Sequence, residues 1–326
     1  MTSTGTSAIN TEMHVRVVEI TPVAAAIKLF TLVRTDGEPL PVFAPGAHVV
    51  VSMIDGGRLR RNPYSLMSSP TDTSKYEISV LRVEQSRGGS AFLHEQLQVG
   101  DGLTISQPLN LFPIDNWGRR HLLVAGGVGI TPFVPMMEAM NTSGRPFELH
   151  YSIRSRPHGA YWSTLADRYG SRVRLAVDDE GDRIDYRALL INQPLGTHLY
   201  VCGPRPMLDH VLSVARGLGW PDENIHFELF LAPPPGVPFT VSLARSGLQL
   251  DVEEHQSLLE AIEAAGVDAP YLCRGGACGQ CETVVARADG ELLHNDHFLT
   301  DDEKASGTKI MPCVSRFVGA GLTLDL

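Results

Sequence analysis

Short runs of β-branched and other apolar residues, separated by turns, make up the first third of the chain. The runs are Val15–Val18, Ala26–Val33, His48–Met53, Tyr76–Leu81 and Leu103–Ile105, with glycine and proline between them. Repeated short strands of this kind predict an antiparallel β-barrel, in which closure of the sheet removes its exposed edges. We therefore predict a β-barrel domain over residues 1–117.

From residue 118 the pattern changes to apolar strands that alternate with helical segments. The strand-like runs are His121–Val124, Glu148–Ile153, Val173–Val177 and His198–Cys202. The helical segments are Trp162–Arg168, Tyr186–Leu190 and Pro206–Ala215. This alternation predicts βαβ units and a parallel sheet, so residues 118–230 are assigned to an α/β domain.

A proline-rich segment at residues 231–238 follows, and consecutive prolines predict an extended linker because they cannot join a helix. Beyond it, Phe239–Leu243 and Leu248–Val252 alternate like the strands of a hairpin. Ser257 and Glu260 have the spacing of a capping box that opens a helix. Residues 239–326 therefore predict a small α+β domain, and a bound metal would help to stabilise a domain of this size.

Four of the five cysteines lie in this last domain. Cys273, Cys278 and Cys281 are spaced C-x4-C-x2-C, and Cys313 follows after a longer gap. This spacing is typical of the plant-type [2Fe–2S] ligand set, and the small residues between the ligands suit a loop wrapped round a cluster. The alternative is a structural zinc knuckle, which favours two short C-x2-C pairs. The pattern therefore predicts an electron carrier.

Two upstream segments carry residue types that could hold a flat, phosphorylated cofactor. Tyr64 and Ser65 pair an aromatic ring with a hydroxyl, and Arg60–Leu66 includes two arginines. The turn Arg87–Ser90 adds an arginine and two glycines, which can hold a phosphate through a guanidinium and backbone N–H groups. Each segment alone is also compatible with an exposed strand edge.

The α/β region contains a glycine-rich turn at residues 126–132. A strand, a glycine turn and a helix let a pyrophosphate approach backbone N–H groups, and we expect Thr131 to cap the helix and Pro132 to lie in its first turn. Cys202 ends a later strand, at the edge where such sheets bind ligands. Its alternative is a buried small apolar residue.

Charge and composition exclude several classes of protein. The net charge of −10 disfavours nucleic acid and anionic membranes as partners. The first dozen residues show no signal-peptide pattern, and glycines and prolines interrupt the apolar stretch His121–Met140, which argues against a membrane span. Cysteine use concentrated in one site favours the reducing cytoplasm.

Taken in order, these segments resemble the phthalate dioxygenase reductase family, the flavin and iron–sulfur reductases that serve Rieske non-haem iron oxygenases. The resemblance covers about Val15 to Leu326. It implies a flavin-binding barrel with FMN, then an NAD(P)H-binding parallel-sheet domain and a C-terminal ferredoxin domain of the β-grasp kind.

The resemblance also assigns residues. The flavin contacts it implies are Arg61, Tyr64, Ser65, Leu66, Arg87, Gly88, Gly89, Ser90 and the nearby aromatic Phe230. The nicotinamide-nucleotide contacts it implies are Gly126, Gly127, Gly129, Thr131, Pro132, Cys202, Gly203 and Pro204. Ser65, Tyr64 and Cys202 are the candidate catalytic residues. The family usually reads Arg-x-Tyr-Ser, whereas Arg61 lies three residues before Tyr64, so Arg60 competes for the phosphate.

These assignments predict an enzyme that passes hydride from NADH through FMN to the cluster, and single electrons onward to a separate oxygenase. An FAD-containing relative that serves another monooxygenase and a redox-sensing protein are the alternatives. Asp178 with its acidic neighbours favours NADH, while Arg154 and Arg156 would favour NADPH.

Two polar segments near the cysteines have competing interpretations. His294, Asp296 and His297 resemble part of a metal-binding triad, but a polar turn is the simpler interpretation. Arg274, beside the first cysteine ligand, is either a docking contact for a partner or a solvated charge.

Overall fold

The computed structural model describes residues 12–84, 87–230 and 235–326. The expectation of no signal peptide concerns the first dozen residues, of which 1–11 lie outside the described residues. Residues 231–234, the first half of the predicted linker, also lie outside them. By its contacts the chain divides into two compact units. The first contains residues 1–49, 64–81 and 98–230, and the second contains residues 50–63, 82–97 and 231–326.

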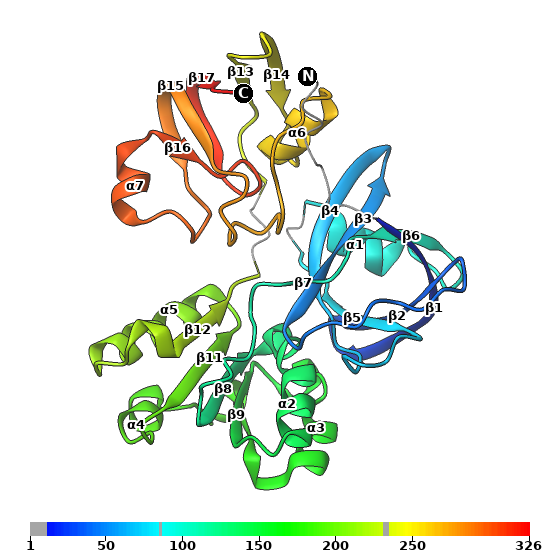
Figure 1. The fold of residues 1–326 in the computed structure, drawn as a ribbon, viewed down its shortest axis with the longest axis vertical. Coiled ribbons are helices and arrows are strands. Elements are labelled where there is room, and N and C mark those ends of the chain that lie inside the picture. Colours follow the sequence, from blue (N-terminus) through cyan, green and yellow to red (C-terminus); the bar gives the residue numbers. More distant parts are fainter. Residues whose placement is uncertain (1–11, 85–86, 231–234) are drawn as a thin grey trace, which may run out of the picture. The chain divides into compact units, whose positions relative to one another are not determined.

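The N-terminal strands form one antiparallel sheet in the order β4-β3-β6-β1-β2-β5, with β7 paired to β3 (Figure 1). Its elements are β1 (Met13–Ala24), β2 (Ile27–Arg34), β3 (Ala47–Asp55), β4 (Arg58–Ser65), β5 (Tyr76–Leu81), β6 (Gly102–Ile105), β7 (Leu109–Asn110) and the helix α1 (Gly89–Glu95). At the start of β1, Met13, Val15 and Val17 are buried and alternate with exposed residues, as a half-buried strand requires.

The strand β4 was not among the predicted strands. Its first residues, Arg58 to Pro63, are mostly polar and lack the apolar alternation that marks the other strands. The pairing of β4 with β3 compensates for its weak local preference. As a result, Tyr64 and Ser65 lie at the end of a strand.

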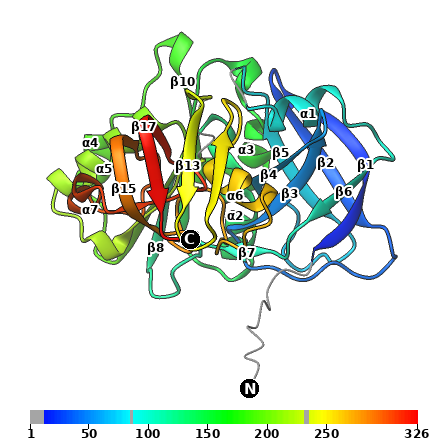
Figure 2. The same ribbon diagram turned by 90° about the horizontal axis from the view of Figure 1, so that it is seen from above.

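The second sheet is parallel, with the order β10-β9-β8-β11-β12. Figure 1 labels β8, β9, β11 and β12, and Figure 2 labels β10. Its strands are β8 (Arg120–Gly126), β9 (Phe147–Ile153), β10 (Val173–Val177), β11 (Thr197–Cys202) and β12 (Ile225–Glu228). Its helices are α2 (Phe133–Thr142), α3 (Trp162–Tyr169), α4 (Tyr186–Ile191) and α5 (Arg205–Gly217). The chain runs from β8 outward to β10 and then returns to β11, so the strand order reverses between β8 and β11. Doubly wound sheets bind ligands at such a reversal, beyond the carboxyl ends of the strands.

The start of α2 corrects one expectation. Thr131 does not cap the helix, because its hydroxyl donates to the Val128 carbonyl within the 3-10 turn Gly127–Ile130. Pro132 occupies the N-cap position of α2 and not its first turn. The apolar stretch His121–Met140 is divided between β8 and α2, and no helix in the described part of the chain is long and apolar enough to cross a membrane.

The C-terminal sheet is mixed, in the order β14-β13-β17-β15-β16, with β13 and β17 parallel. Its elements are β13 (Phe239–Leu243), β14 (Leu248–Val252), α6 (Leu258–Ala264), β15 (Thr283–Leu293), α7 (Asp301–Ser306), β16 (Lys309–Ile310) and β17 (Arg316–Leu324). The predicted capping box is confirmed, since Ser257 accepts from the Glu260 N–H and Glu260 accepts from the Ser257 N–H. Leu258, Leu259 and Ile262 place α6 on the core of this sheet.

The last residues of the predicted linker are held in place. The Arg316 guanidinium donates to the carbonyls of Gly236 and Val237, and also to those of Glu253 and Gln256. A guanidinium has donors enough for such a set of carbonyls. Residues 236–237 are therefore bound to the ferredoxin-like sheet.

Candidate functional site

The four cysteines predicted as ligands lie together in one site. The Sγ atoms of Cys281 and Cys313 are 3.3 Å apart. Cys273 is hydrogen-bonded to Cys278, and its charge also acts on Cys281 and Cys313. The hydrogen bond between the two thiols lowers the pKa of Cys273 and raises that of Cys278, so a proton is shared unequally within the pair.

The backbone of the cysteine loop is shaped for a compact cluster. Gly276 and Gly279 have positive φ angles, and a Cβ at Gly279 would lie 2.3 Å from the Phe298 ring. The Gly275 N–H donates to Cys273 Sγ at 3.4 Å, as expected of a loop that directs amides at sulfur. The residues present therefore fit a [2Fe–2S] cluster held by four thiolates.

The nearby histidines have a structural role. Asp296 is buried, accepts from the Leu299 N–H and the Ser315 hydroxyl, and lies 3.6 Å from His294. These contacts of Asp296 fit the polar-turn interpretation of residues 294–297. Arg274 is only 7% exposed and pairs with Glu263, so it is neither a solvated charge nor an exposed docking contact.

At the end of β4, Ser65 carries a feature that fits a cofactor. Its side chain is buried, and its Oγ has no hydrogen-bond partner among the described residues. Buried hydroxyls are nearly always paired, so an orphaned one indicates a missing partner. Tyr64 is half-buried beside it, and the fully buried Leu66 bonds through its N–H to the Ala47 carbonyl.

The turn before α1 is tightly built. Gly88 has φ 117°, and a Cβ at Gly89 would lie 2.2 Å from the Asn62 Nδ2 atom. Ser90 accepts a hydrogen bond from the Val83 N–H. This geometry keeps backbone N–H groups accessible in a region where side chains would block an approaching phosphate.

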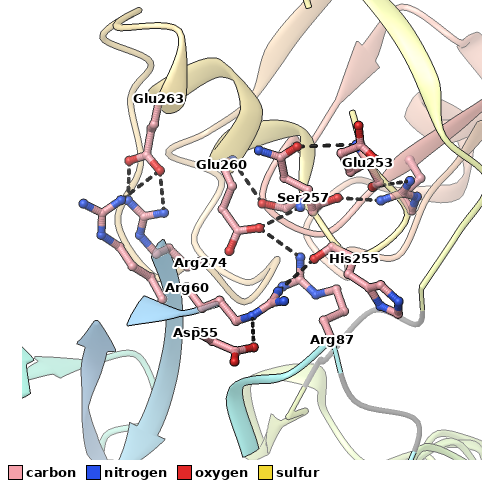
Figure 3. Close-up of polar contacts among 12 residues, drawn as sticks. Asp55, Arg60, Arg87, Glu253, His255, Ser257, Glu260, Glu263 and Arg274 are labelled. Atoms are coloured by element: carbon pink, nitrogen blue, oxygen red, sulfur yellow. Dashed lines mark hydrogen bonds and ion pairs between the residues drawn. The ribbon is translucent and has the colours of Figure 1, made fainter. Parts of the chain in front are cut away.

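The candidate phosphate-binding arginines already have partners in the described structure. Arg60 donates to Asp55 and to the His255 carbonyl, at 3.0 Å each. Arg87 pairs with Glu260 at 3.3 Å, as Figure 3 shows. Arg61 pairs with Glu263 at 3.1 Å. Each arginine is held by the polypeptide, and each has further N–H donors for an anion.

The turns after β8 and β11 pack so closely that several of their positions have room only for glycine. A Cβ on Gly129 would lie 2.2 Å from the Cys202 carbonyl oxygen. A Cβ on Gly203 would lie 3.0 Å from the Gly126 backbone, and Gly127 has φ 53°. The turns that follow β8 and β11 therefore meet backbone to backbone, with Pro204 packed beside Gly126. This contact lies at the carboxyl ends of β8 and β11, where doubly wound sheets bind nucleotides.

Glu228 is a residue of this edge that sequence reasoning missed as a site residue. It pairs in register with Cys202, at the ends of β12 and β11. Glu228 is half-buried, and its Oε2 atom is inaccessible to solvent and has no hydrogen-bond partner in the described part of the chain. Burial raises the pKa of Glu228 to about 8, and it raises the pKa of the Cys202 thiol as well. Both groups are therefore neutral at pH 7. An acidic residue that ends a buried strand was the signal available in the sequence.

The ends of β9 and β10 carry the charges expected near a nucleotide ribose. Arg156 makes a two-pronged ion pair with Glu180, at 2.6 and 2.8 Å. The Asp179 N–H donates to the Arg154 carbonyl, which holds the two turns together. Asp178 is exposed directly after β10.

A separate group of Asp115, His198 and His226 has atoms spaced closely enough for a metal ion. His198 Nδ1 and His226 Nε2 already lie 2.9 Å apart as a hydrogen bond, and Tyr200 stacks on His226. Burial lowers the pKa of His226 to about 4, so the ring is neutral at pH 7. The internal bonds of this group account for its geometry.

Comparison with protein families identifies parts of the chain. The model of the 2Fe-2S iron-sulfur cluster binding domain matches residues 241–318, which include all four cysteines. A model described as dimethylamine monooxygenase subunit DmmA-like, N-terminal domain, matches residues 106–225. The first match supports the iron–sulfur interpretation of the thiols over a zinc knuckle.

Similar proteins cover nearly the whole chain. The heme-dependent oxidative N-demethylase beta subunit of Ectopseudomonas mendocina (strain ymp) is 45% identical over 94% of this chain and 96% of its own. A carnitine monooxygenase reductase subunit of Acinetobacter baumannii is 43% identical over 95% and 96%. The solved structure titled phthalate dioxygenase reductase, a modular structure for electron transfer from pyridine nucleotides to [2Fe-2S], is 35% identical. It has a TM-score of 0.87 and covers 97% of this chain and 98% of that chain.

The fold and the four-thiol site define a modular oxidoreductase, with an antiparallel β-sheet domain, a parallel α/β sheet and an α+β iron–sulfur domain. The chain belongs to the phthalate dioxygenase reductase family. The predicted fold class and family are thereby confirmed. Two of the three named relatives are called reductases, one of a carnitine monooxygenase and one of a phthalate dioxygenase, and the third is called a demethylase beta subunit.

Proposed function

We propose that the protein takes hydride from NADH through FMN to its [2Fe–2S] cluster and passes single electrons to a separate oxygenase. The observation that carries the proposal is the four-thiol site, because an iron–sulfur cluster moves one electron while a nicotinamide delivers two. When bound, a flavin supplies the conversion between the two. A cluster held by the four thiolates would supply the one-electron exit.

In this proposal, residues of the chain bind and orient the flavin and the nicotinamide nucleotide. The Ser65 hydroxyl, which lacks a partner among the described side chains, would donate a hydrogen bond to the flavin, and Tyr64 would supply an aromatic contact beside it. Arg61 or Arg60 and the turn of Arg87, Gly88, Gly89 and Ser90 would hold its phosphate, and the exposed Phe230 would supply apolar contact. Leu66 is fully buried and would support the end of β4 from the core. The turns Gly126–Pro132 and Cys202–Pro204 would contact the nicotinamide nucleotide. Because its thiol is buried and protonated, Cys202 contributes shape and not nucleophilicity.

NADH is the favoured donor. The Arg156 guanidinium, which would otherwise attract the extra phosphate of NADPH, is neutralised by Glu180. Asp178 adds negative charge at the same edge, where it suits a ribose hydroxyl. Comparing kcat/KM for NADH and NADPH tests this preference, and a higher value with NADPH would reverse it.

The partner is proposed to be a terminal oxygenase of the Rieske non-haem iron kind. A haem-dependent demethylase is a second candidate, supported by the 45% identical relative named for that activity. The names of this relative and of the carnitine monooxygenase reductase subunit favour an amine substrate for the whole system. Mixing the reduced protein with each kind of oxygenase and measuring substrate-dependent oxygen uptake separates the two.

We also propose domain limits and a location. The limits are residues 1–117 for the flavin barrel, 118–230 for the nucleotide domain, 231–238 for the linker and 239–326 for the ferredoxin domain. The cytoplasm is the proposed compartment, supported by free cysteines in the described structure, which suit a reducing environment.

The decisive experiment is catalytic reduction of cytochrome c or a dye by NADH, with all cofactors bound. Turnover supports the reductase, whereas its absence would favour the redox-sensing alternative. A second measurement tests the FAD alternative. Flavin released by heat is separated on a column, which distinguishes FMN from FAD.

A further inference from the structure

One carboxylate of α6 binds two arginines that come from different parts of the chain. Arg274 of the cysteine loop forms a two-pronged ion pair with Glu263, with Nη1 2.9 Å from Oε2 and Nη2 bonded to Oε1. Arg61 of β4 bonds the same Oε2 atom at 3.1 Å. The three side chains are 4%, 17% and 20% exposed for Arg274, Glu263 and Arg61. All three lie in the second compact unit.

The Arg274 end of this link is built into the cluster loop. Arg274 follows the ligand Cys273 directly and has a φ of 52°, a left-handed conformation that costs a non-glycine residue about 1 kcal/mol or more. Its guanidinium also lies 3.8 Å from the centre of the Tyr271 ring. The next residue, Gly275, points its N–H at Cys273 Sγ. Figure 3 shows the contact of Glu263 with Arg274. Glu263 and Tyr271 therefore hold the backbone conformation that directs the Gly275 amide at the sulfur.

The Arg61 end of the link is built into the strand that leads to the flavin-side residues. Arg61 lies on β4, which ends at Ser65. On the same helix, one turn earlier, Glu260 pairs with Arg87. The Arg60 guanidinium reaches the His255 carbonyl just before the helix. Helix α6 is thus tied to β4 and to the Arg87 turn by charged hydrogen bonds, which are the strong ones.

We propose that Glu263 is a positioning residue for electron transfer, which holds the cluster loop and β4 in register by binding Arg274 and Arg61 at one carboxylate. The inference rests on the proposed function and adds to it the residue that fixes the route from flavin to cluster. The network contains four guanidiniums, of Arg60, Arg61, Arg87 and Arg274, against the carboxylates of Asp55, Glu260 and Glu263. Its charge complementarity therefore depends on each carboxylate.

Two substitutions separate positioning from folding. Glu263→Gln removes the charge and leaves the shape, so both arginines lose their ionic partner. Glu263→Asp keeps the charge next to the buried Arg274 but is one methylene shorter, so it cannot bond both arginines at once. Asp325→Asn is the matched control, because it removes a carboxylate of the same domain that pairs with the exposed Arg245.

The measurement is anaerobic stopped-flow reduction of the full chain by NADH, with flavin and cluster absorbance followed separately. We expect flavin reduction to keep its rate in both Glu263 variants. Cluster reduction should slow by roughly tenfold in Glu263→Gln and by less in Glu263→Asp, since a misplacement of about 1 Å costs up to ~100-fold in positioned reactions. Asp325→Asn should match the parent in both phases.

Two further readouts do not depend on turnover. Hydrogen–deuterium exchange should become faster at the Gly275 amide and in β4 of the Glu263 variants, while the cluster's reduction potential stays unchanged. An unchanged cluster phase in both variants would overturn the proposal. So would a shift of the potential large enough to explain the slowing, because Glu263 would then tune the cluster and not position it.

A variant that fails to fold around its cluster can be distinguished from a failure of the proposed function. If Glu263→Gln lost its cluster, the rate of cluster reduction in Glu263→Asp would test the proposal, since that variant keeps an ionic partner for Arg274. If NADH reduced neither group in the unsubstituted protein, the proposed function itself would fail, whatever the variants did.

Discussion

Ser65 carries a buried hydroxyl whose partner is not among the described protein groups. If that hydroxyl serves the flavin, Ser65→Ala should slow flavin reduction by NADH by roughly tenfold, the value of one hydrogen bond of about 1.5 kcal/mol. Stability should change little, because no protein hydrogen bond is lost. Stopped-flow absorbance measures the rate, and thermal unfolding measures the stability.

Ser68→Ala is the control for this change, since Ser68 is also buried with an unpaired Oγ in the described structure. Its flavin reduction should match that of the parent protein. Equal slowing in both variants would mean that the effect comes from packing and not from a bond to the cofactor.

Glu228 should make the protein less stable as the pH rises. Burial raises the pKa of Glu228 to about 8, from the ordinary glutamate pKa of 4.5 that applies to the unfolded chain. Between these values the folded state holds a proton that the unfolded state has released. The unfolding free energy therefore falls with rising pH, by up to about 1.4 kcal/mol per pH unit, and levels off above pH 8.

Urea unfolding from pH 5 to 8 measures this slope. Glu228→Gln should remove that part of the slope, because the amide does not titrate. Glu223→Gln, at an exposed position in the turn before β12, should keep it. A parent slope equal to that of Glu228→Gln would show that Glu228 is ionised when buried.

At the scale of elements, the contact between the turns after β8 and β11 decides the shape of the nucleotide edge. Gly129→Ala places a Cβ 2.2 Å from the Cys202 carbonyl oxygen, which belongs to backbone that cannot easily move. We expect a loss of about 1–3 kcal/mol in stability and a raised KM for NADH. Circular dichroism melting and steady-state kinetics measure the two effects.

Gly217→Ala is the matched control at the end of α5, where a Cβ would meet nothing within 4 Å. Alanine favours a helix over glycine by up to about 1 kcal/mol, so this variant should be as stable as the parent or more so. Parent-like stability in Gly129→Ala would show that the two turns separate without cost.

At the scale of the whole molecule, the cluster should be needed only for the last step. Cys313→Ser removes one of four thiolates and should abolish cytochrome c reduction, since a [2Fe–2S] cluster needs its full ligand set. Flavin reduction by NADH should continue. Iron analysis and stopped-flow absorbance report the two results, and continued cytochrome c reduction without iron would place the exit of electrons at the flavin.

Cys202→Ser is the companion variant for this test, because it alters the remaining cysteine, which lies outside the cluster loop. It should retain its iron. Loss of iron in both variants would mean that the cluster depends on general folding and not on the four-thiol set.

Local patterns in the sequence were sufficient to predict most of the helices and strands. β5, β10, β13 and β14 begin and end where the apolar runs predicted, because alternation and turn residues mark strand limits directly. The capping box of α6 is equally local. The strand β4 and the uncapped start of α2 were missed, because pairing with β3 and the 3-10 turn before α2 override local preference.

By itself the sequence determined the kind of site, since the C-x4-C-x2-C spacing and its later cysteine specify the ligand chemistry. It also determined the order of sheets, which follows from the period of the apolar residues. Only the tertiary structure decided which charges meet. Arg274 looked like a surface charge in the sequence, yet folding buries it against Glu263, eleven residues earlier in the chain. The same carboxylate binds Arg61, 202 residues away. Ion pairs carry no local pattern, because they depend on distance in space and not on spacing along the chain.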